Sequence, residues 1–209
     1  QLNLAKAKRD EGDRAAAEAL YEKALVGCKK QHGADHPNVA LVQNDLACLI
    51  HSQRDFAGAV LVFRRALAIR KKQHAPEHGQ VAVALKHLAV ALMSKGDLAE
   101  AELLFQRAIA IHKDPEEVAR LEKHLATVRR GIANILESGG EESWKFAASL
   151  HTLAFDKYQE LDFVAAEPLC RRALKVREEI WRSKPVKVTR ATRVAATHGH
   201  GANESAYSS

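Results

Sequence analysis

The sequence predicts an all-α fold, a right-handed solenoid of antiparallel helix pairs, and three observations lead to it. A set of residues recurs at a fixed interval of 42 positions, which is the mark of a repeat architecture. Apolar residues make up 46% of the 209-residue chain and aromatic residues only 5%, so alanine and leucine fill the core and favour helices. The few glycine and proline residues fall mostly between the predicted helices, where they punctuate one helix from the next.

Residues 1–112 contain three helix pairs in register. One aromatic residue marks the second helix of each pair, at Tyr21, Phe63 and Phe105. The same interval separates Leu4-Ala5, Leu46-Ala47 and Leu88-Ala89 in the first helices, and Ala17, Ala59 and Ala101 in the second helices. Alanines at these places let two helices approach closely, and the aromatic side chain fills the space beside them.

The second pair shows the helical period of both helices. Pro37 pre-sets the first turn of one helix, which continues through His51. Apolar residues then recur every three or four positions from Phe56 to Ile69, as expected for one buried stripe of a second helix. The break between the two helices is short, so they must run antiparallel.

Residues 113–140 depart from the repeat. The segment Val118–Val128 is similar to Val81–Ala91, so it begins like another first helix, but no second helix follows it. Pro115 lies near its start and Gly139-Gly140 ends it. We therefore predict one long unpaired spacer helix that offsets the last pair from the preceding superhelix.

A fourth pair is predicted at residues 141–182, followed by a basic tail at 183–209. The fourth pair repeats the motif through Leu153-Ala154, Ala166, Cys170 and Ala173. The tail carries Lys184, Lys187, Arg190 and Arg193 against Glu204, which is about half of the net charge of +6. Without a sustained helical period, the tail is expected to be extended and irregular.

These motifs resemble the tetratricopeptide repeat, and specifically the 42-residue class found in kinesin light chains. A loop ending in Asp35-His36-Pro37 leads into the helix that contains Asn44–Ala47, and Arg64–Leu67 forms an Arg-Arg-Ala-Leu run that returns at Arg171–Leu174. The resemblance covers residues 1–112 and 144–180. It implies a solenoid that binds other proteins.

The resemblance also implies where a partner would bind. The first helix of each pair lines the concave wall of such a solenoid, at fixed offsets from its Leu-Ala step. These offsets give the predicted partner-binding groove: Lys6, Arg9, Asn44, Cys48, His51, Lys86, Val90, Met93, His151, Phe155 and Tyr158. By the same resemblance Asn44 pairs with a ligand backbone. Lys86 and His151 stand where asparagine is expected, which implies a more basic groove.

Charge in this groove suggests the kind of partner. Lys6, Arg9 and Lys86 favour an acidic, extended protein segment, although each alone is more often a solvated surface charge. Nucleic acid is not expected, because the basic charge is concentrated in the tail and the repeat period differs from that of RNA-reading repeats. No small-molecule substrate is expected, and no segment reaches the ~20 apolar residues of a membrane span.

Two histidine pairs suggest a metal site, but their context argues against it. The pairs are His32 with His36 and His74 with His78. Gly33 and Pro76 lie inside them and mark loops, where a spacing of four places no two residues on one helical face. No further ligands complete a set, so we expect neither metal nor cofactor, and expect His36 to cap the next helix or to fill the joint between repeats. Without a phosphate loop, nucleophile elbow or activated cysteine, no catalytic residue is assigned and no enzyme is predicted.

The predicted function is a non-catalytic adaptor or scaffold that holds a partner segment in the concave groove. The alternative is a structural subunit permanently embedded in a large ciliary, cytoskeletal or organellar assembly. A free adaptor should be monomeric, whereas a permanent subunit should need its partner to cover apolar patches. The expected location is cytoplasmic or associated with cytoskeleton or cilium. Because the sequence begins with Gln1 rather than Met, an organellar location stays open.

Overall fold

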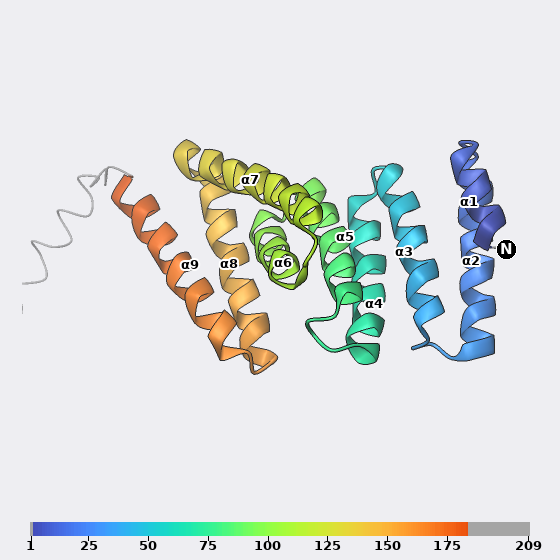
Figure 1. The fold of residues 1–209 in the computed structure, drawn as a ribbon. Helices are drawn as coiled ribbons and strands as arrows, with labels where there is room; N and C mark the ends of the chain where they lie inside the picture. Colours follow the sequence, from blue (N-terminus) through green and yellow to red (C-terminus); the bar gives the residue numbers. More distant parts are fainter. Residues whose placement is uncertain (1, 184–209) are drawn as a thin grey trace, which may run out of the picture.

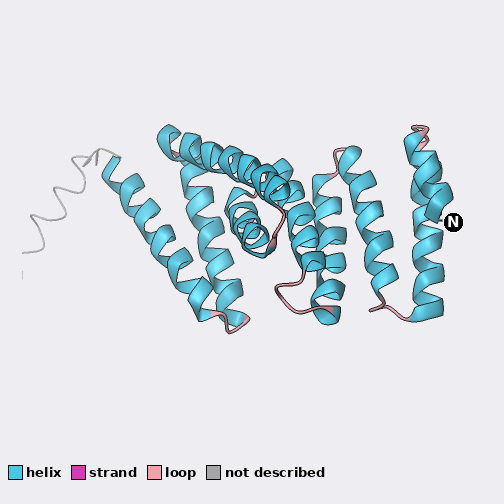
Figure 2. Ribbon diagram, viewed as in Figure 1, coloured by secondary structure: helices cyan, strands magenta, loops and turns pink. Residues whose placement is uncertain are grey.

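The computed structural model describes residues 2–183, and every regular element in this range is an α-helix (Figure 1; Figure 2). The helices are α1 (Leu2–Asp10), α2 (Arg14–His32), α3 (Pro37–Ser52), α4 (Phe56–Gln73), α5 (Gly79–Lys95), α6 (Leu98–Ile111), α7 (Pro115–Ser138), α8 (Glu141–Gln159) and α9 (Phe163–Ser183). This confirms the predicted all-α class. None of these helices has the length and apolar character that crossing a membrane requires. The predicted basic tail lies, from residue 184 on, outside the described residues.

A tight turn of one geometry joins the two helices of each pair. Its central residue has a positive φ in all four pairs: +85° at Gly12, +68° at Arg54, +98° at Gly96 and +59° at Leu161. An aspartate follows each of them, and Asp13 caps α2 by accepting the N–H of Ala16. Glycine adopts a positive φ at little cost. Arg54 and Leu161 therefore keep the same turn under some strain.

Alanines and aromatic residues form the core that the repeat pattern predicts. Tyr21, Phe63 and Phe105 are buried, with 0%, 4% and 0% of their surface exposed. The alanines that face each other within the first three pairs are all fully buried: Ala5, Ala17, Ala47, Ala59, Ala89 and Ala101. In the fourth pair the aromatic position is taken by Cys170, which is exposed.

Helix α7 packs against the repeats as a further first helix. Its stripe of Leu121, Leu125, Val128 and Ile132 is buried in the same core cluster as α5 and α6. Figure 1 shows α7 running across α6 in the direction of α8. Helix α8 then pairs with α9, so α7 has no second helix of its own. The row of first helices α1, α3 and α5 is thus extended by α7.

A buried carboxylate connects the middle of the molecule to the last pair. The side chain of Glu102 on α6 is only 8% exposed, and its oxygens lie 3.1 Å from Nε of Arg129 on α7 and 2.6 Å from Nη1 of Arg172 on α9. The Arg172 guanidinium also lies over the ring of Phe146 on α8, 5.6 Å from its centroid. Charge-assisted bonds to a buried acid are among the stronger polar contacts. They hold α6, α7, α8 and α9 together.

Candidate functional site

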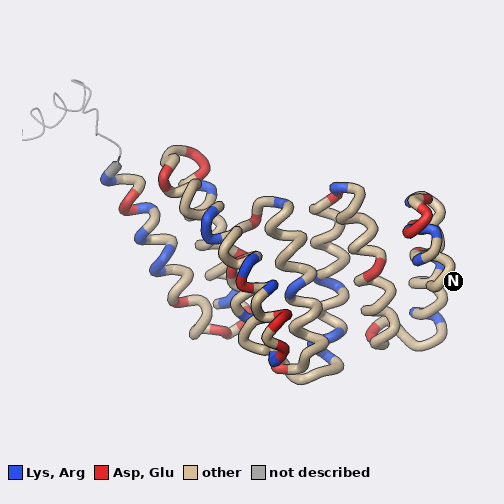
Figure 3. The backbone as a smooth tube through the Cα atoms, turned by 45° about the horizontal axis from the view of Figure 1, so that its top comes forward, with Lys and Arg blue, Asp and Glu red and all other residues tan. Residues whose placement is uncertain are grey.

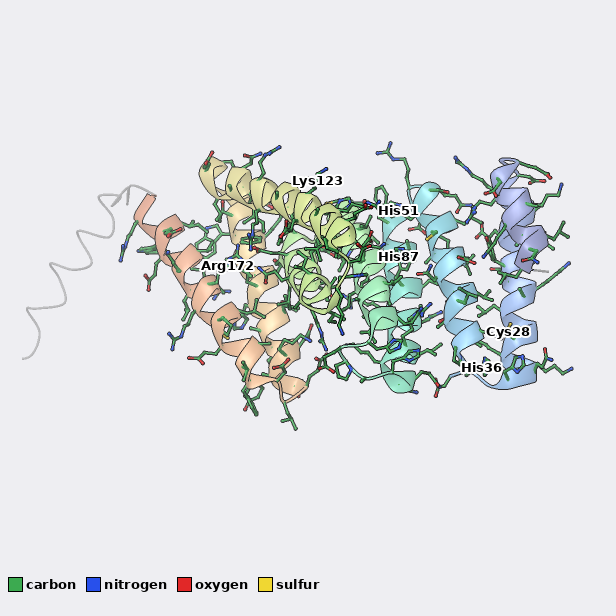
Figure 4. The ribbon with its side chains drawn as sticks, viewed as in Figure 1. Cys28, His36, His51, His87, Lys123 and Arg172 are labelled. Carbon is green, nitrogen blue, oxygen red and sulfur yellow. The ribbon has the colours of Figure 1, made fainter. Side chains whose placement is uncertain are left out.

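A pocket of about 310 Å³ lies where α3, α4 and α5 meet α7. Side chains one helical turn apart on these helices line it: Cys48, His51, Phe63, Lys86, His87, Val90, Glu117, Arg120, Leu121 and His124. Figure 4 shows His51 and His87 beside the N-terminal half of α7. We call this the α7 pocket. It combines an apolar floor with charged and hydrogen-bonding groups at its rim.

Polar contacts join each first helix to the next along the same wall. Lys6 Nζ lies 3.2 Å from Asp45 Oδ2, His87 Nδ1 lies 2.7 Å from Asn44 Oδ1, His51 Nε2 lies 3.0 Å from Ser94 Oγ, and Lys86 Nζ lies 2.6 Å from Glu117 Oε1. These contacts, here called the first-helix ladder, connect α1 to α3, α3 to α5 and α5 to α7. Because both partners sit on rigid helices, the ladder fixes the spacing of the wall.

His87 is the most strongly perturbed group of the α7 pocket. Burial lowers the pKa of its imidazole to about 4, and the neighbouring charge of Lys86 acts in the same direction. The ring is therefore neutral at physiological pH, and its Nδ1–H donates to Asn44 Oδ1. Its other neighbour is the ring of Phe63, with centroids 5.8 Å apart. His87 thus acts as a positioned hydrogen-bond donor and not as a charge.

His51 and Cys48 on α3 are also uncharged at physiological pH. Burial lowers the pKa of His51, which stays neutral and bonds Ser94. Burial also raises the pKa of the Cys48 thiol, followed by the effect of the Asp45 charge. A protonated thiol is a poor nucleophile. The chemistry at this end of the pocket is that of packing and hydrogen bonding.

Glu117 on α7 is the acid of the α7 pocket and binds two cations. It accepts from Lys86 at 2.6 Å and from Arg120 at 3.1 Å, and the bond from Lys86 is the main reason that the pKa of this carboxyl falls below its usual value. Arg120 also lies 3.6 Å from Oε2 of Glu116, so the charges of these four groups balance. Lys123, one turn further along α7, is exposed and makes no ion pair within residues 2–183 (Figure 4). Elsewhere, opposite charges interleave along the helices (Figure 3).

Sequence comparison identifies the repeat. The model of the tetratricopeptide repeat matches residues 1–72 and 62–114, more than half of the chain. The chain belongs to the tetratricopeptide repeat family. Its fold is of the kind that serves as a protein–protein interaction adaptor, and the family is generally non-catalytic. Among curated proteins, none matches the sequence.

Solved tetratricopeptide-type structures share the fold. BtubC (BKLC) from P. vanneervenii superposes with a TM-score of 0.60 at 21% identity, over 100% of this chain and 67% of that one. A putative kinesin light chain of P. anserina with nearly identical TPR-like repeats gives a TM-score of 0.53 at 22% identity, over 87% of this chain and 95% of that one. A second structure of the same kind gives 0.53 at 21% identity, over 87% and 92%. At such identities the likeness concerns the fold alone.

The tetratricopeptide solenoid places the predicted groove residues in separate regions. Cys48, His51, Lys86 and Val90 line the α7 pocket, and Asn44 touches it through its bond with His87. Met93 is half-buried against the core. Lys6 and Arg9 lie on α1, where they pair with Asp45 and Asp10. His151, Phe155 and Tyr158 line another pocket, on the last pair. The assignment of these residues to a binding groove stays a prediction.

Sequence reasoning missed the contribution of α7 to this wall. Glu117, Arg120 and His124 all line the α7 pocket, yet the segment was expected to be a spacer. The signal was present, because the likeness of Val118–Val128 to Val81–Ala91 places His124 at the position of His87 and Lys123 at that of Lys86. Extending the first-helix pattern to this segment would have added α7 to the groove.

The histidine pairs in the repeat loops cap helices. The rings of His32 and His36 stack with centroids 4.5 Å apart, and those of His74 and His78 stack at 4.1 Å. Nδ1 of His36 accepts the N–H of Asn38 at 3.1 Å, and His78 makes the equivalent contact in the next loop. This confirms the capping role predicted for His36. Among residues 2–183 no group of three or more potential metal ligands gathers.

Proposed function

We propose that the chain is a non-catalytic adaptor that binds an extended segment of a partner protein along the wall formed by α3, α5 and α7. The observation that supports this proposal is the α7 pocket, which offers a volume of about 310 Å³. Its apolar floor suits one anchoring side chain, and the polar rim suits the backbone around it. A single filled pocket of this kind supplies much of the binding energy in many interfaces.

The partner is proposed to carry acidic residues, although the basis for this differs from the one the sequence suggested. Lys6 and Lys86 already pair with Asp45 and Glu117, so they attract an incoming anion less than free lysines would. Arg120 pairs with Glu117 and Glu116 as well, and the cation without an ion pair among residues 2–183 is Lys123, one turn further along α7. A carboxylate of the partner would gain most by approaching this end of the pocket.

Residues that could serve catalysis are proposed to have structural roles. His51 and His87 are held neutral and bonded to Ser94 and Asn44, and the Cys48 thiol is held protonated by burial. A general base needs a free, correctly poised nitrogen, and a nucleophile needs an activating neighbour. Binding requires neither.

The test is a charge reversal on α7. The variant Arg120→Glu/Lys123→Glu should lose an acidic partner in affinity purification from the native source, because it turns into anions one cation that lines the pocket and one that lies a helical turn further along α7. A matched control, Arg65→Glu, changes an exposed cation on α4 outside the pocket. Fluorescence anisotropy with the partner segment should then show binding at least ~10-fold weaker for the double variant and steeper salt dependence for the unaltered chain.

If the double variant and the control retain the same partners with equal affinity, the α7 end of the wall is not the binding site. Equal loss in both would mean a general charge effect instead of a local one. Either result would sink the proposal. Circular dichroism of each variant separates loss of binding from loss of fold.

A permanent structural subunit is the second candidate, and the exposed apolar residues of the last pair favour it. Phe155, Tyr158 and Trp181 have 56%, 56% and 68% of their surface exposed. The structural neighbours include a putative kinesin light chain, which is the basis for proposing association with the cytoskeleton. Sedimentation velocity of the isolated chain discriminates, since an adaptor should remain monomeric and a permanent subunit should self-associate or aggregate.

A further inference from the structure

The last helix pair exposes several large apolar side chains. Its large apolar residues, with their exposed fractions, are Phe155 56%, Tyr158 56%, Phe163 54%, Leu174 59% and Trp181 68%. Phe163, Cys170, Leu174 and Trp181 follow one another at steps of seven, four and seven residues along α9, so they share one helical stripe. We call the surface that they form with Phe155 and Tyr158 the α9 face. In Figure 1, α9 stands at the end of the row of helices, opposite α1 and α2.

The same stripe is covered in the earlier pairs. Val60, Phe63 and Leu67 on α4 are 5%, 4% and 6% exposed, and α5 packs on that helix. Their counterparts on α9 are Glu167, Cys170 and Leu174, all exposed. The α9 face is therefore the surface that receives the next first helix in every preceding pair. Among residues 2–183, its large apolar side chains stay exposed.

A cavity on this face is shaped by one substitution within the repeat. A pocket of about 360 Å³ is lined by His151, Ala154, Phe155, Tyr158, Phe163, Ala166, Glu167 and Cys170. Tyr21, Phe63 and Phe105 fill the corresponding position in the other pairs, whereas here it is Cys170. The smaller side chain leaves room for a large apolar group supplied from outside.

Glu167 specifies the charge of the occupant. It occupies the repeat position of Glu18 and Glu102, which is Val60 in the second pair, and each of the two glutamates is met by a donor on the following helix. Glu102 accepts from Arg129 of α7 at 3.1 Å, and Glu18 accepts from Gln53 at the end of α3 at 3.0 Å. Within residues 2–183, the ion pair of Glu167 is with the exposed Arg171 of its own helix, at 2.5 Å. An incoming helix with a cation at this level would complete the pattern.

We infer that the α9 face binds an amphipathic helix of a partner protein, seated as α5 is seated on the second pair. The helix would carry large apolar residues at three- and four-residue intervals and an arginine or lysine opposite Glu167. A second hollow of about 300 Å³, lined by Trp144, Leu174, Arg177, Glu178, Trp181 and Arg182, continues the surface to the far end of α9. Helix-in-groove recognition uses this chemistry. This surface is separate from the α7 pocket.

The probe for the test is a synthetic peptide of residues 115–138, the α7 sequence. It carries the stripe Leu121, Leu125, Val128 and Ile132 and the arginine that meets Glu102. The readout is tryptophan fluorescence of the full chain, because both of its tryptophans, Trp144 and Trp181, lie on the last pair. We expect a saturable blue shift as Trp181 becomes covered.

Matched variants locate the site. Leu174→Asp on the α9 face should weaken peptide binding about tenfold or more, as loss of a central contact does. Leu61→Asp, which alters an equally exposed leucine on α4 (60% against 59%), should leave binding unchanged. A peptide with Arg129→Glu should bind the chain weakly, and Glu167→Arg in the chain should restore its binding.

Three outcomes would overturn the inference. In the first, the peptide does not bind and iodide quenches Trp181 freely, so the face recognises no helix. In the second, the peptide does not bind and Trp181 is protected from iodide at every protein concentration, so residues 184–209 of the same chain cover the face. In the third, the protection of Trp181 disappears when the protein is diluted, and sedimentation shows a dimer dissociating, so a second copy covers the face. None of these outcomes depends on whether the α7 pocket binds a partner.

Discussion

At the scale of single residues, His87 shows how burial sets a charge state in this solenoid. Its folded pKa is about 4, below the usual value of 6.5, so between these values the unfolded chain binds a proton that the folded chain does not. Stability should therefore rise with pH across this window. The contribution is complete above pH 6.5 and is lost as the pH falls toward 4.

We expect the titration of His87 to make the free energy of unfolding about 2 kcal/mol lower at pH 5 than at pH 8. Urea unfolding of the unaltered chain and of His87→Gln, followed by circular dichroism over this pH range, isolates the effect as the difference between their slopes. Parallel slopes for the two proteins would contradict the assignment.

Tyr21 carries a buried hydroxyl that has no hydrogen-bond partner among the described residues. Phenylalanine stands at the same repeat position in the next two pairs, at Phe63 and Phe105. Tyr21→Phe should raise the free energy of unfolding by about 1 kcal/mol, because it removes an unpaired buried polar atom. The matched control is Phe105→Tyr, which adds a hydroxyl at a fully buried site and should destabilise. A loss of stability in Tyr21→Phe would mean that its hydroxyl is bonded.

At the scale of helices, Glu102 decides how the last pair attaches to the rest. Its carboxylate joins α6 to α7 through Arg129 and to α9 through Arg172. Glu102→Gln should lower the free energy of unfolding by about 2–3 kcal/mol, because two charge-assisted bonds lose their acceptor charge in a buried place. Denaturant unfolding gives this value.

The control for this change is Glu178→Gln on α9, whose carboxylate lies 3.9 Å from Arg182 with both side chains exposed. An exposed pair of this kind contributes at most about 1 kcal/mol and often nothing measurable. If the two changes lower the free energy of unfolding equally, Glu102 does not stabilise the attachment of the last pair.

At the scale of the whole molecule, the repeat pattern was enough to predict the helices and their core. Alignment of Tyr21, Phe63 and Phe105 identified residues that the structure buries, because side chains at equivalent positions of stacked pairs meet the same neighbours. The pattern also showed that the histidine loops are joints between pairs. Periodicity of this kind records which face of a helix is buried.

Periodicity does not record which polar side chain meets which. The sequence suggests a ligand backbone as the partner of Asn44, and in the free chain Asn44 bonds His87, 43 residues away. Lys86 is predicted to favour an acidic partner, and in the free chain it bonds Glu117 on α7, 31 residues away. Such pairs depend on the stacking of successive helices, and the residue type changes from repeat to repeat: Asp45, the partner of Lys6, and His87, the partner of Asn44, stand 42 residues apart. The sequence could predict which helices line the groove, but it could not predict which charged side chains there are already paired.

The first-helix ladder has a mechanical consequence. Its contacts run along one wall from α1 to α7. Separating the first helices of this part of the superhelix therefore requires several polar contacts to break together. The last pair is attached in another way: Ser143 Oγ on α8 donates to the backbone carbonyl of Ile135 on α7 at 2.7 Å, and Glu102 on α6 bonds Arg172 on α9. One proposed binding surface lies on the ladder wall and the other on the last pair, so these contacts set how the two surfaces are oriented to each other. A change at Glu102 should therefore alter that orientation as well as the stability.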